Sequence, residues 1–341
     1  MCPDDASNDA RQPASLRPDE ALRGHLAADM AAVDAVIAER MASEAAPRIP
    51  EVTAHLVGAG GKRLRPLLTL ATARLCGYDG RHHIDLAATV EFIHTATLLH
   101  DDVVDESARR RGRPTANLLW DNKSSVLVGD YLFARAFELM VGTGSLRVLG
   151  ILSQASARIA EGEVLQLTAA GNLATDEATY LKVVRGKTAT LFAAACEAGA
   201  AIAEAPDATI EALRVYGDAL GIAFQMVDDF LDYGGAGDGI GKNLGDDFRE
   251  GKLTLPVIRA VAAADAQERA FWSRVIEAGD QREGDLDHAM GLIRRHGALE
   301  ATRTAALDWS AEARSALSEL PPHPLRDQLD ALAEYVVARV I

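Results

Sequence analysis

The sequence predicts an all-α protein, and two observations carry this prediction. Alanine, the strongest helix former, occurs 63 times among the 341 residues, whereas aromatic residues make up 5% of the chain. Runs of β-branched and aromatic residues with the two-residue alternation of strands are scarce. With 48% hydrophobic residues, a chain of this length can bury the core of one large domain. We therefore expect a single domain built as a bundle of many helices.

Proline and glycine divide the chain into its expected helices. Residues 1–18 hold three prolines and many polar residues, which predicts a disordered tail, and residues 19–341 form the predicted helical domain. We expect breaks between helices at 47–50, 58–61, 77–80, 142–144, 171–172, 206–207 and 321–324. A longer glycine-rich loop is expected over 233–247.

Charge, cysteine content and hydropathy exclude several classes of protein. A net charge of −15 disfavours nucleic-acid binding, which needs a basic surface. The three cysteines are far apart and lack the spacing of zinc ligands, which is typical of a reducing cytoplasm. The most apolar segment, 188–203, is interrupted by Glu197 and is too short to span a membrane.

An acidic cluster ends the helix expected to begin near Asp85. Residues 98–106 read LLHDDVVDE, and four acids within six residues repel one another. On a helix, Asp101 and Asp105 lie one turn apart on the same face, about 6 Å along the axis. Two such carboxylates suit a hard divalent cation such as Mg²⁺. Taken alone, the cluster is slightly more typical of a solvated acidic face than of a metal site.

The same Asp-Asp-x-x-Asp pattern returns 127 residues later. Residues 225–232 read QMVDDFLD, which places Asp228 and Asp232 at the same spacing. The apolar neighbours Val227 and Phe230 predict a largely buried helix, and buried carboxylates without counter-charge are strongly unfavourable. The repeat therefore predicts that the two clusters face each other across a cavity and share metal ions.

Basic segments accompany the acidic ones. They are GGKRLRP at 60–66, RRRGRP at 109–114, GKT at 186–188 and KNLGDDFREGK at 242–252. Arginine binds phosphate through two parallel hydrogen bonds, and glycine lets backbone N–H groups approach it. Neither GK pair has the glycine of a Walker A loop. Each segment could also be a solvated basic loop. His94 lies two turns before Asp101 on the same helix face.

Together these motifs resemble those of the trans-isoprenyl diphosphate synthases, also called polyprenyl synthetases. The matching features are GGKRxRP, the two DDxxD clusters, RRG after the first cluster, GKT, and GKxxGDDxxEGK. Their order and spacing agree from about residue 55 to 260. The combination is specific, although a single DDxxD is not.

The resemblance implies an all-α bundle around a deep central cavity, usually homodimeric and Mg²⁺-dependent. The family condenses isopentenyl diphosphate head to tail onto an allylic diphosphate. Asp101, Asp105, Asp228 and Asp232 would hold the metal, with Asp102 and Asp229 in support. Isopentenyl diphosphate would contact Lys62, Arg65, His94 and Arg111, the allylic diphosphate Arg110, and the leaving diphosphate Lys187, Thr188, Gln225, Lys242 and Lys252. The chemistry would rest chiefly on Asp101, Asp105, Asp228, Lys187 and Lys242.

Product length is expected to depend on the helix that carries Asp101. In the family, bulky aromatic residues at the fifth and fourth positions before the first aspartate close the pocket. Here these positions hold the small residues Ala96 and Thr97, which predicts a long tunnel and a long-chain product of the quinone side-chain kind. Both could also be ordinary helix residues, with the floor built by Phe133, Phe137 or Met140.

Four alternatives remain at this stage. A short-chain farnesyl or geranylgeranyl synthase would share the motifs, and a non-catalytic subunit of a heteromeric synthase would usually lack members of the acidic clusters. Terpene cyclases share the first DDxxD but carry a different second metal motif. An HD-type phosphohydrolase could use His100-Asp101 with His82 and His83, but it would leave the second cluster and both Lys-Gly segments without a role.

Overall fold

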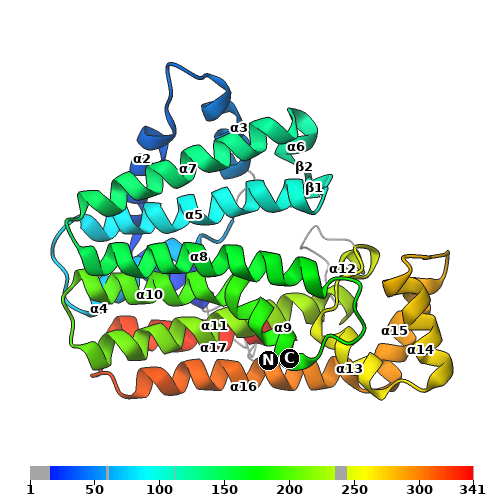
Figure 1. Cartoon of the computed structure of the whole chain (residues 1–341). Helices are drawn as coiled ribbons and strands as arrows, with labels where there is room; N and C mark the ends of the chain where they lie inside the picture. Colours follow the sequence, from blue (N-terminus) through cyan, green and yellow to red (C-terminus); the bar gives the residue numbers. More distant parts are fainter. Residues whose placement is uncertain (1–15, 59–60, 111, 235–243, 341) are drawn as a thin grey trace, which may run out of the picture.

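The computed structural model describes residues 16–58, 61–110, 112–234 and 244–340, and it is 78% helical. The all-α prediction is confirmed (Figure 1). In chain order the helices are α1 (Pro18–His25), α2 (Ala27–Met41), α3 (Arg48–Gly58), α4 (Leu64–Leu75), α5 (His82–Val104), α6 (Ala116–Leu119), α7 (Asn122–Gly142), α8 (Leu146–Ala169), α9 (Glu177–Val184), α10 (Thr190–Ile202), α11 (Asp207–Gly234), α12 (Asp246–Arg249), α13 (Leu255–Ala263), α14 (Ala266–Trp272), α15 (Asp285–Arg295), α16 (Ala298–Ser318) and α17 (Pro324–Val337).

Three shorter helical turns and one hairpin complete the described elements. Two turns are π-helical, η1 (Arg185–Ala189) and η2 (Ser273–Glu277), and the third, η3 (Ala338–Val340), is a 3₁₀ turn. Strands β1 (Arg109–Arg110) and β2 (Arg113–Pro114) pair antiparallel. The sequence did not predict this hairpin, because two residues per strand leave no alternation to detect.

The helices end where glycine and proline predicted breaks. Each of the seven expected breaks falls between two helices or at a helix end, with Pro50 in the first turn of α3. α1 begins at Pro18, close to the predicted boundary of the tail, and residues 1–15 lie outside the described residues, so the tail stays a prediction. The glycine-rich loop begins where α11 ends at Gly234; residues 235–243 are likewise outside the described residues.

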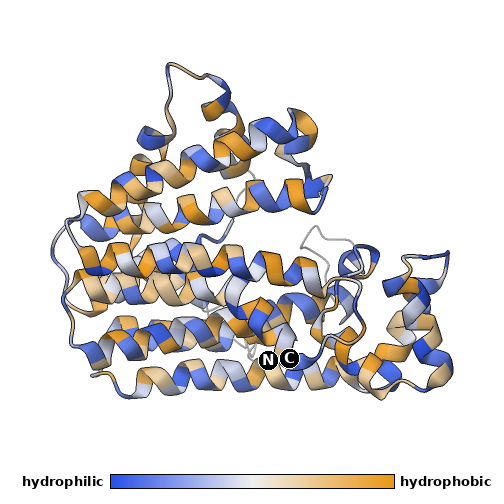
Figure 2. Cartoon of the chain, in the orientation of Figure 1, coloured by the Kyte–Doolittle hydropathy of each residue, from blue (hydrophilic) through white to orange (hydrophobic). Residues whose placement is uncertain are grey.

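α10 is the central helix of the bundle. It packs against α4, α5, α8 and α11, and ten of its residues are buried. Figure 2 shows it mostly in apolar colours, whereas outer helices such as α7 and α16 alternate between apolar and polar residues. The apolar segment 188–203 is thus a core helix. Among the described residues no helix is both long and apolar enough to cross a membrane.

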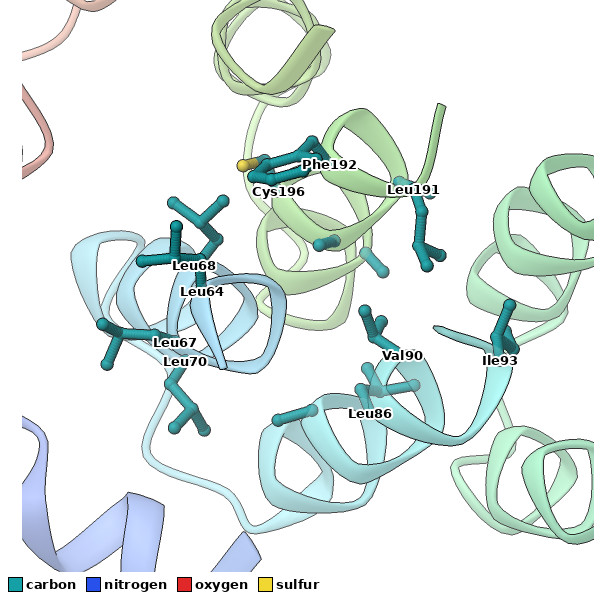
Figure 3. Close-up of a cluster of buried hydrophobic side chains, with 14 of the residues drawn as sticks. Leu64, Leu67, Leu68, Leu70, Leu86, Val90, Ile93, Leu191, Phe192 and Cys196 are labelled. Atoms are coloured by element: carbon teal, nitrogen blue, oxygen red, sulfur yellow. The ribbon is translucent and has the colours of Figure 1, made fainter. Parts of the chain in front are cut away.

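The core between α4, α5 and α10 consists mainly of aliphatic side chains, joined by Phe192 and Cys196 of α10 (Figure 3). Leu67 and Leu70 of α4, Leu86 and Val90 of α5, and Cys196 of α10 are completely buried. Burial of each large aliphatic side chain stabilises the fold by about 1.5–3 kcal/mol. This core fixes α4 and α5, the two helices that carry Arg65 and the first acidic cluster.

Glycines allow α10 to approach its neighbours closely. A Cβ atom at Gly217 of α11 would lie 2.5 Å from the carbonyl oxygen of Phe192, and one at Gly199 of α10 would lie 2.1 Å from Thr72 Oγ1. Both distances are shorter than van der Waals contact, so there is no room for a side chain at either glycine. The backbone of α11 therefore packs directly on α10 at Gly217, and that of α10 on α4 at Gly199. Close packing of α10 on α11 brings the segment before α10 next to the second acidic cluster.

A separate hydrophobic cluster anchors the segment that follows the second acidic cluster. Tyr233 at the end of α11 packs with Phe248 of α12 and with Trp272 of α14, and all three are buried. In Figure 1, α13, α14 and α15 project beyond the main bundle at the end where α12 lies. The cluster therefore ties the chain around Asp246–Lys252 to the end of α11.

α5 and α11 run in the same direction, so their C-terminal ends lie at the same end of the bundle (Figure 1). Both Asp-Asp-x-x-Asp clusters occupy these C-terminal ends. The helix arrangement thus gathers the predicted site residues of two segments far apart in the sequence.

Replacement of Gly217 by alanine should destabilise the protein. The added Cβ would collide with the backbone of α10, and overpacking of this kind costs about 1–3 kcal/mol. The control is Gly150→Ala in α8, where a Cβ meets nothing within 4 Å and helix propensity should raise stability by up to about 1 kcal/mol. Urea unfolding measures both. Equal effects of the two substitutions would contradict the close packing.

Candidate active site

The first acidic cluster occupies the C-terminal end of α5. The last helical residue is Val104, and Asp105 caps the helix by donating its N–H to the Asp101 carbonyl oxygen at 2.8 Å. Asp101 and Asp105 are both partly buried. The negative end of the helix dipole lies here, so carboxylates are unfavourable and cations are attracted. The site therefore needs positive charge from other elements.

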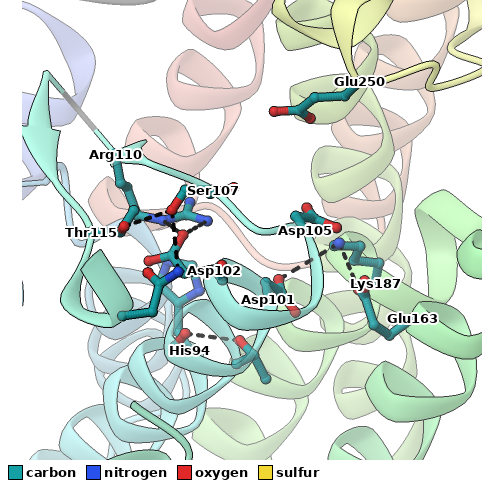
Figure 4. Close-up of polar contacts among 12 residues, drawn as sticks. His94, Asp101, Asp102, Asp105, Ser107, Arg110, Thr115, Glu163, Lys187 and Glu250 are labelled. Carbon is teal, nitrogen blue, oxygen red and sulfur yellow. Dashed lines mark hydrogen bonds and ion pairs between the residues drawn. The ribbon is translucent and has the colours of Figure 1, made fainter. Parts of the chain in front are cut away.

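Lys187 supplies positive charge at Asp101. Its Nζ lies 3.6 Å from Asp101 Oδ2 and 2.6 Å from Glu163 Oε2 of α8, so one ammonium group joins two acids (Figure 4). Burial raises the pKa of Asp101 from 3.8 to about 6; the charge of Lys187 opposes this rise, and that of Glu163 adds to it. The sequence analysis missed Glu163, whose one signal is an acid among the apolar residues of α8.

Lys252 supplies positive charge at Asp105, although 147 residues separate the two. Its Nζ lies 3.0 Å from Asp105 Oδ2 and 2.6 Å from Glu250 Oε2. Burial acts to lower the pKa of Lys252, but the hydrogen bond to Glu250 and the charges of both acids outweigh it and raise the pKa. Lys252 is therefore charged, and it joins the segment after α12 to the end of α5.

Asp102 is neutralised by the arginine hairpin. It is completely buried, and its Oδ1 accepts hydrogen bonds from Arg110 Nε at 2.9 Å and Nη2 at 2.8 Å. Asn117 of α6 donates to its carbonyl oxygen, and Thr115 donates to that of Ser107, which fixes the hairpin (Figure 4). Asp102 thus lies in the interior beside Arg110, and its supporting role stays a prediction. Arg111 lies outside the described residues.

Arg65 and His94 come together from α4 and α5. Arg65 Nη1 lies 3.3 Å from His94 Nε2, and the guanidinium stands 4.4 Å above the ring of Phe192. Lys62 precedes α4, and its Nζ lies 5.3 Å from the ring centre of Tyr335 in α17. Three of the four residues that the resemblance assigns to isopentenyl diphosphate thus lie in described elements at the start of α4 and on α5.

The second acidic cluster lies at the end of α11. Asp228 is partly buried, and Asp229 and Asp232 are buried. The two carboxylate oxygens of Asp232 accept the backbone N–H groups of Asp246 and Asp247, each at 3.2 Å. Asp232 therefore fixes the start of α12 as well as belonging to the cluster. Lys242 lies outside the described residues.

Gln225 and Thr188 contact each other beside the second cluster, and their assignment to the diphosphate stays a prediction. Thr188 Oγ1 donates to Gln225 Oε1 at 2.9 Å, and Gln225 Nε2 donates to Asp229 Oδ1 at 2.9 Å. Tyr180 of α9, which the sequence analysis also missed, donates to Asp229 Oδ2 at 2.6 Å.

The predicted chain-length residues lie on α5 below the first cluster. Ala96 is completely buried in the core, and Thr97 donates its hydroxyl to the His94 carbonyl oxygen at 2.8 Å. Of the alternative floor residues, Met140 is buried, whereas Phe137 is 44% exposed. Phe133 is partly buried and stacks on His100.

The acids fit a divalent cation shared with a diphosphate better than a metal held by protein ligands alone. Within the described ranges, no group of three or more His, Cys, Asp or Glu side chains is arranged to hold a metal ion. Instead, lysine ammonium groups lie where cations would bind Asp101 and Asp105. Mg²⁺ binds through one or two carboxylates together with water and phosphate oxygens, which matches this donor set.

A sequence profile of the polyprenyl synthetase family matches residues 46–293. The chain belongs to this family. It is similar to the octaprenyl diphosphate synthase of Escherichia coli (strain K12), with 44% identity over 313 residues that cover 92% of this chain and 96% of the relative. It is also 42% identical to the all-trans-nonaprenyl-diphosphate synthase of Rhodobacter capsulatus, over 92% of this chain and 96% of that protein.

Solved structures agree with these relatives. A decaprenyl diphosphate synthase from Rhodobacter capsulatus is 71% identical and superposes with a TM-score of 0.92, covering 95% of this chain and all of that one. A polyprenyl synthase from Caulobacter crescentus, complexed with calcium and isoprenyl diphosphate, is 52% identical with a TM-score of 0.90, over 96% of this chain and 99% of that one.

The polyprenyl synthetase comparison confirms three predictions: the family, the isoprenoid-synthase type of all-α fold, and the activity of a trans-prenyltransferase that makes long-chain polyprenyl diphosphate. The short-chain, non-catalytic and phosphohydrolase alternatives are not favoured.

Replacement of Asp101 by asparagine should abolish chain extension and yet stabilise the metal-free protein. Because folding raises the pKa of Asp101 to about 6, the ionised side chain destabilises the native state at pH 7.5, by roughly 1–3 kcal/mol. This cost is absent below pH 4, grows between pH 4 and 6, and is complete above pH 6. Urea unfolding should show the gain at pH 7.5 and its loss at pH 4. If Asp101→Asn were less stable than the wild type at pH 7.5, the claim that the ionised Asp101 side chain destabilises the native state would be wrong.

Proposed function

We propose that the C-terminal ends of α5 and α11 form one site that binds two diphosphates and condenses their isoprenoid chains. The observation that carries this proposal is that Lys187 and Lys252, from two distant segments, each join an aspartate of the first cluster to a second acid. Such cations can move from the carboxylates to a bound diphosphate. The allylic diphosphate then lies against Arg110, Lys187, Thr188, Gln225, Lys242 and Lys252.

The second diphosphate belongs to isopentenyl diphosphate, at Lys62, Arg65, His94 and Arg111. The contact between Arg65 and His94 supports this assignment, because arginine binds phosphate oxygens in pairs and the imidazole adds a donor. Phe192, under the Arg65 guanidinium, holds it in a fixed orientation. Arg111 and Lys242 enter the proposal on the family resemblance.

The reaction requires charge stabilisation and no protein nucleophile. The C–O bond of the allylic diphosphate breaks, and the lysines and Arg110 stabilise the negative charge of the leaving diphosphate. The double bond of isopentenyl diphosphate attacks the allylic carbon to form the new C–C bond, and a proton is then lost to the departing diphosphate. A deep apolar cavity would keep water from the cation.

We assign the cation as Mg²⁺, held by Asp101, Asp105, Asp228 and Asp232. When bound, it neutralises the diphosphate as a Lewis acid. The calcium and isoprenyl diphosphate of the Caulobacter relative support a divalent cation beside the substrate. The net charge of −15 supports the same conclusion, because bare acids would repel the substrate.

Purified protein, Mg²⁺, labelled isopentenyl diphosphate and an allylic primer should give a polyprenyl diphosphate of the length class of the octaprenyl to decaprenyl relatives. Chromatography of the product measures its length. Release of phosphate without chain extension, or products that stop at fifteen or twenty carbons, would contradict the proposal.

We propose that the product grows along α5 past Thr97 and Ala96. Both side chains are small, and Ala96 lies in the core between helices, where a large ring would occupy space. Replacement of Ala96 by phenylalanine should therefore shorten the products, as measured by chromatography. Leu99→Phe, at another buried position of α5, controls for general disturbance of the core. Unchanged product length in Ala96→Phe would contradict this role.

We also propose a homodimer that works in the cytoplasm. Leu127, Phe137 and Val141 are exposed and lie within about 80° of one another around α7, so they form an apolar stripe. Further exposed apolar residues follow on the adjacent helices: Leu118, Leu119, Leu146, Val164 and Leu167. Cys76 and Cys196 are free thiols, which supports a reducing compartment.

Replacement of Leu127 by glutamate should convert the dimer to a monomer, because a charge in the apolar stripe cannot be buried without cost. Leu16→Glu is the matched control, since Leu16 is 72% and Leu127 66% exposed, but Leu16 precedes α1. Sedimentation velocity measures the mass. A monomeric wild type, or a dimeric Leu127→Glu, would contradict an interface on α7.

A further inference from the structure

A buried chain of hydrogen bonds joins three elements at the second acidic cluster. Thr188 donates to Gln225, Gln225 donates to Asp229 Oδ1, and Tyr180 donates to Asp229 Oδ2, at 2.9, 2.9 and 2.6 Å. Tyr180 and Asp229 are 4% and 2% exposed. Both carboxylate oxygens of Asp229 therefore accept hydrogen bonds, one from Gln225 and one from Tyr180.

The two ends of this chain come from one continuous helical segment. Tyr180 lies on α9 and Thr188 on the π-helical turn η1, which follows α9 directly and leads into α10. The segment is thus tied to α11 at two places, before the π-helical turn through Tyr180 and within the turn through Thr188. Lys187 lies within this turn, and π-helical turns are frequent at functional sites because the extra residue redirects side chains.

Close backbone packing holds the other side of the turn. A Cβ atom at Gly186 would lie 2.8 Å from the Cα of Gly162 in α8, next to Glu163. The turn is therefore fixed between α8, through Gly162, and α11, through the hydrogen-bond chain. Burial and the charge of Asp229 raise the pKa of Tyr180 well above 10, so its hydroxyl remains a donor.

We propose that Tyr180 is a positioning residue for the diphosphate site: through Asp229 and Gln225 it fixes the π-helical turn so that Lys187 and Thr188 reach the allylic diphosphate together. The inference rests on the proposed binding of that diphosphate at Lys187, Thr188 and Gln225. Tyr180 itself does not touch the substrate. We expect it to act on one of the two diphosphates, because the hydrogen bonds from Tyr180 to Thr188 involve α9, η1 and α11, whereas Arg65 and His94 belong to α4 and α5.

Tyr180→Phe tests this role, with Tyr216→Phe as the matched control. Tyr216 is also a completely buried tyrosine with one hydrogen bond, from its hydroxyl to the Leu329 carbonyl oxygen at 2.8 Å, away from the site. Each substitution removes one buried hydrogen bond and keeps the ring. The bond to the Asp229 carboxylate is expected to be the stronger of the two, so both variants are assayed at a temperature at which thermal melts show them folded. A difference in substrate binding between the two variants then reflects where the tyrosine lies and not a loss of folded protein.

Tyr180→Phe should raise the KM for the allylic diphosphate about tenfold and leave the KM for isopentenyl diphosphate unchanged. It should also weaken the calorimetric affinity for inorganic pyrophosphate in the presence of Mg²⁺ by a similar factor. Tyr216→Phe should leave all three values at those of the wild type. Tyr180→Phe values equal to those of Tyr216→Phe, or an equal rise in both KM values, would overturn the inference.

A double-mutant cycle gives a second test. Thr188→Val removes the donor at the opposite end of the chain, and the loss of pyrophosphate affinity in Tyr180→Phe/Thr188→Val should be smaller than the product of the two single losses, because either change breaks the same chain. Strictly multiplicative losses would contradict a shared chain. A wild type that binds no pyrophosphate with Mg²⁺ would instead contradict the proposed function.

Discussion

Carboxylates gathered at the C-terminal ends of α5 and α11 impose the constraint on which the site depends. At these ends the helix dipole is negative, and the acids are close enough to repel one another. Each aspartate of the first cluster is balanced from a different part of the chain: Asp101 by Lys187, Asp105 by Lys252, and Asp102 by Arg110. The hairpin, the π-helical turn and the segment after α12 are thus all held by the charges they supply.

The metal-free protein therefore holds in place the lysines that we propose to bind phosphate. Lys187 and Lys252 each contact a second acid, Glu163 or Glu250, which holds the two side chains in place. When a diphosphate and its metal ions bind, the metal ions could replace Lys187 at Asp101. Lys187 would then need to move only a short way to contact the diphosphate. Burial raises the pKa of Asp101, so the ionised side chain lowers the stability of the metal-free fold. This cost accompanies a buried acid that has no metal ion bound.

The sequence predicted the parts of this site and not their pairing. Glycine and proline fix helix ends locally, and the Asp-Asp-x-x-Asp spacing fixes which acids share a face, so both were predictable. The pair Lys252 and Asp105 depends on how α12 packs on the end of α11, which local patterns do not encode. Tyr180 and Glu163 were missed because neither belongs to a motif, and other polar residues of α9 and α8 lie close to them in the sequence. The two-residue strands of the hairpin likewise carry no detectable period.

The central claim is that the acids form a metal site only together with a diphosphate. Calorimetric titration of the wild-type protein with Mg²⁺, with and without inorganic pyrophosphate, tests it most directly. Since lysines occupy Asp101 and Asp105, we predict weak binding of Mg²⁺ alone and at least tenfold tighter binding when pyrophosphate is present, a coupling of about 1.4 kcal/mol or more. Mg²⁺ binding of equal affinity in both titrations would contradict the account.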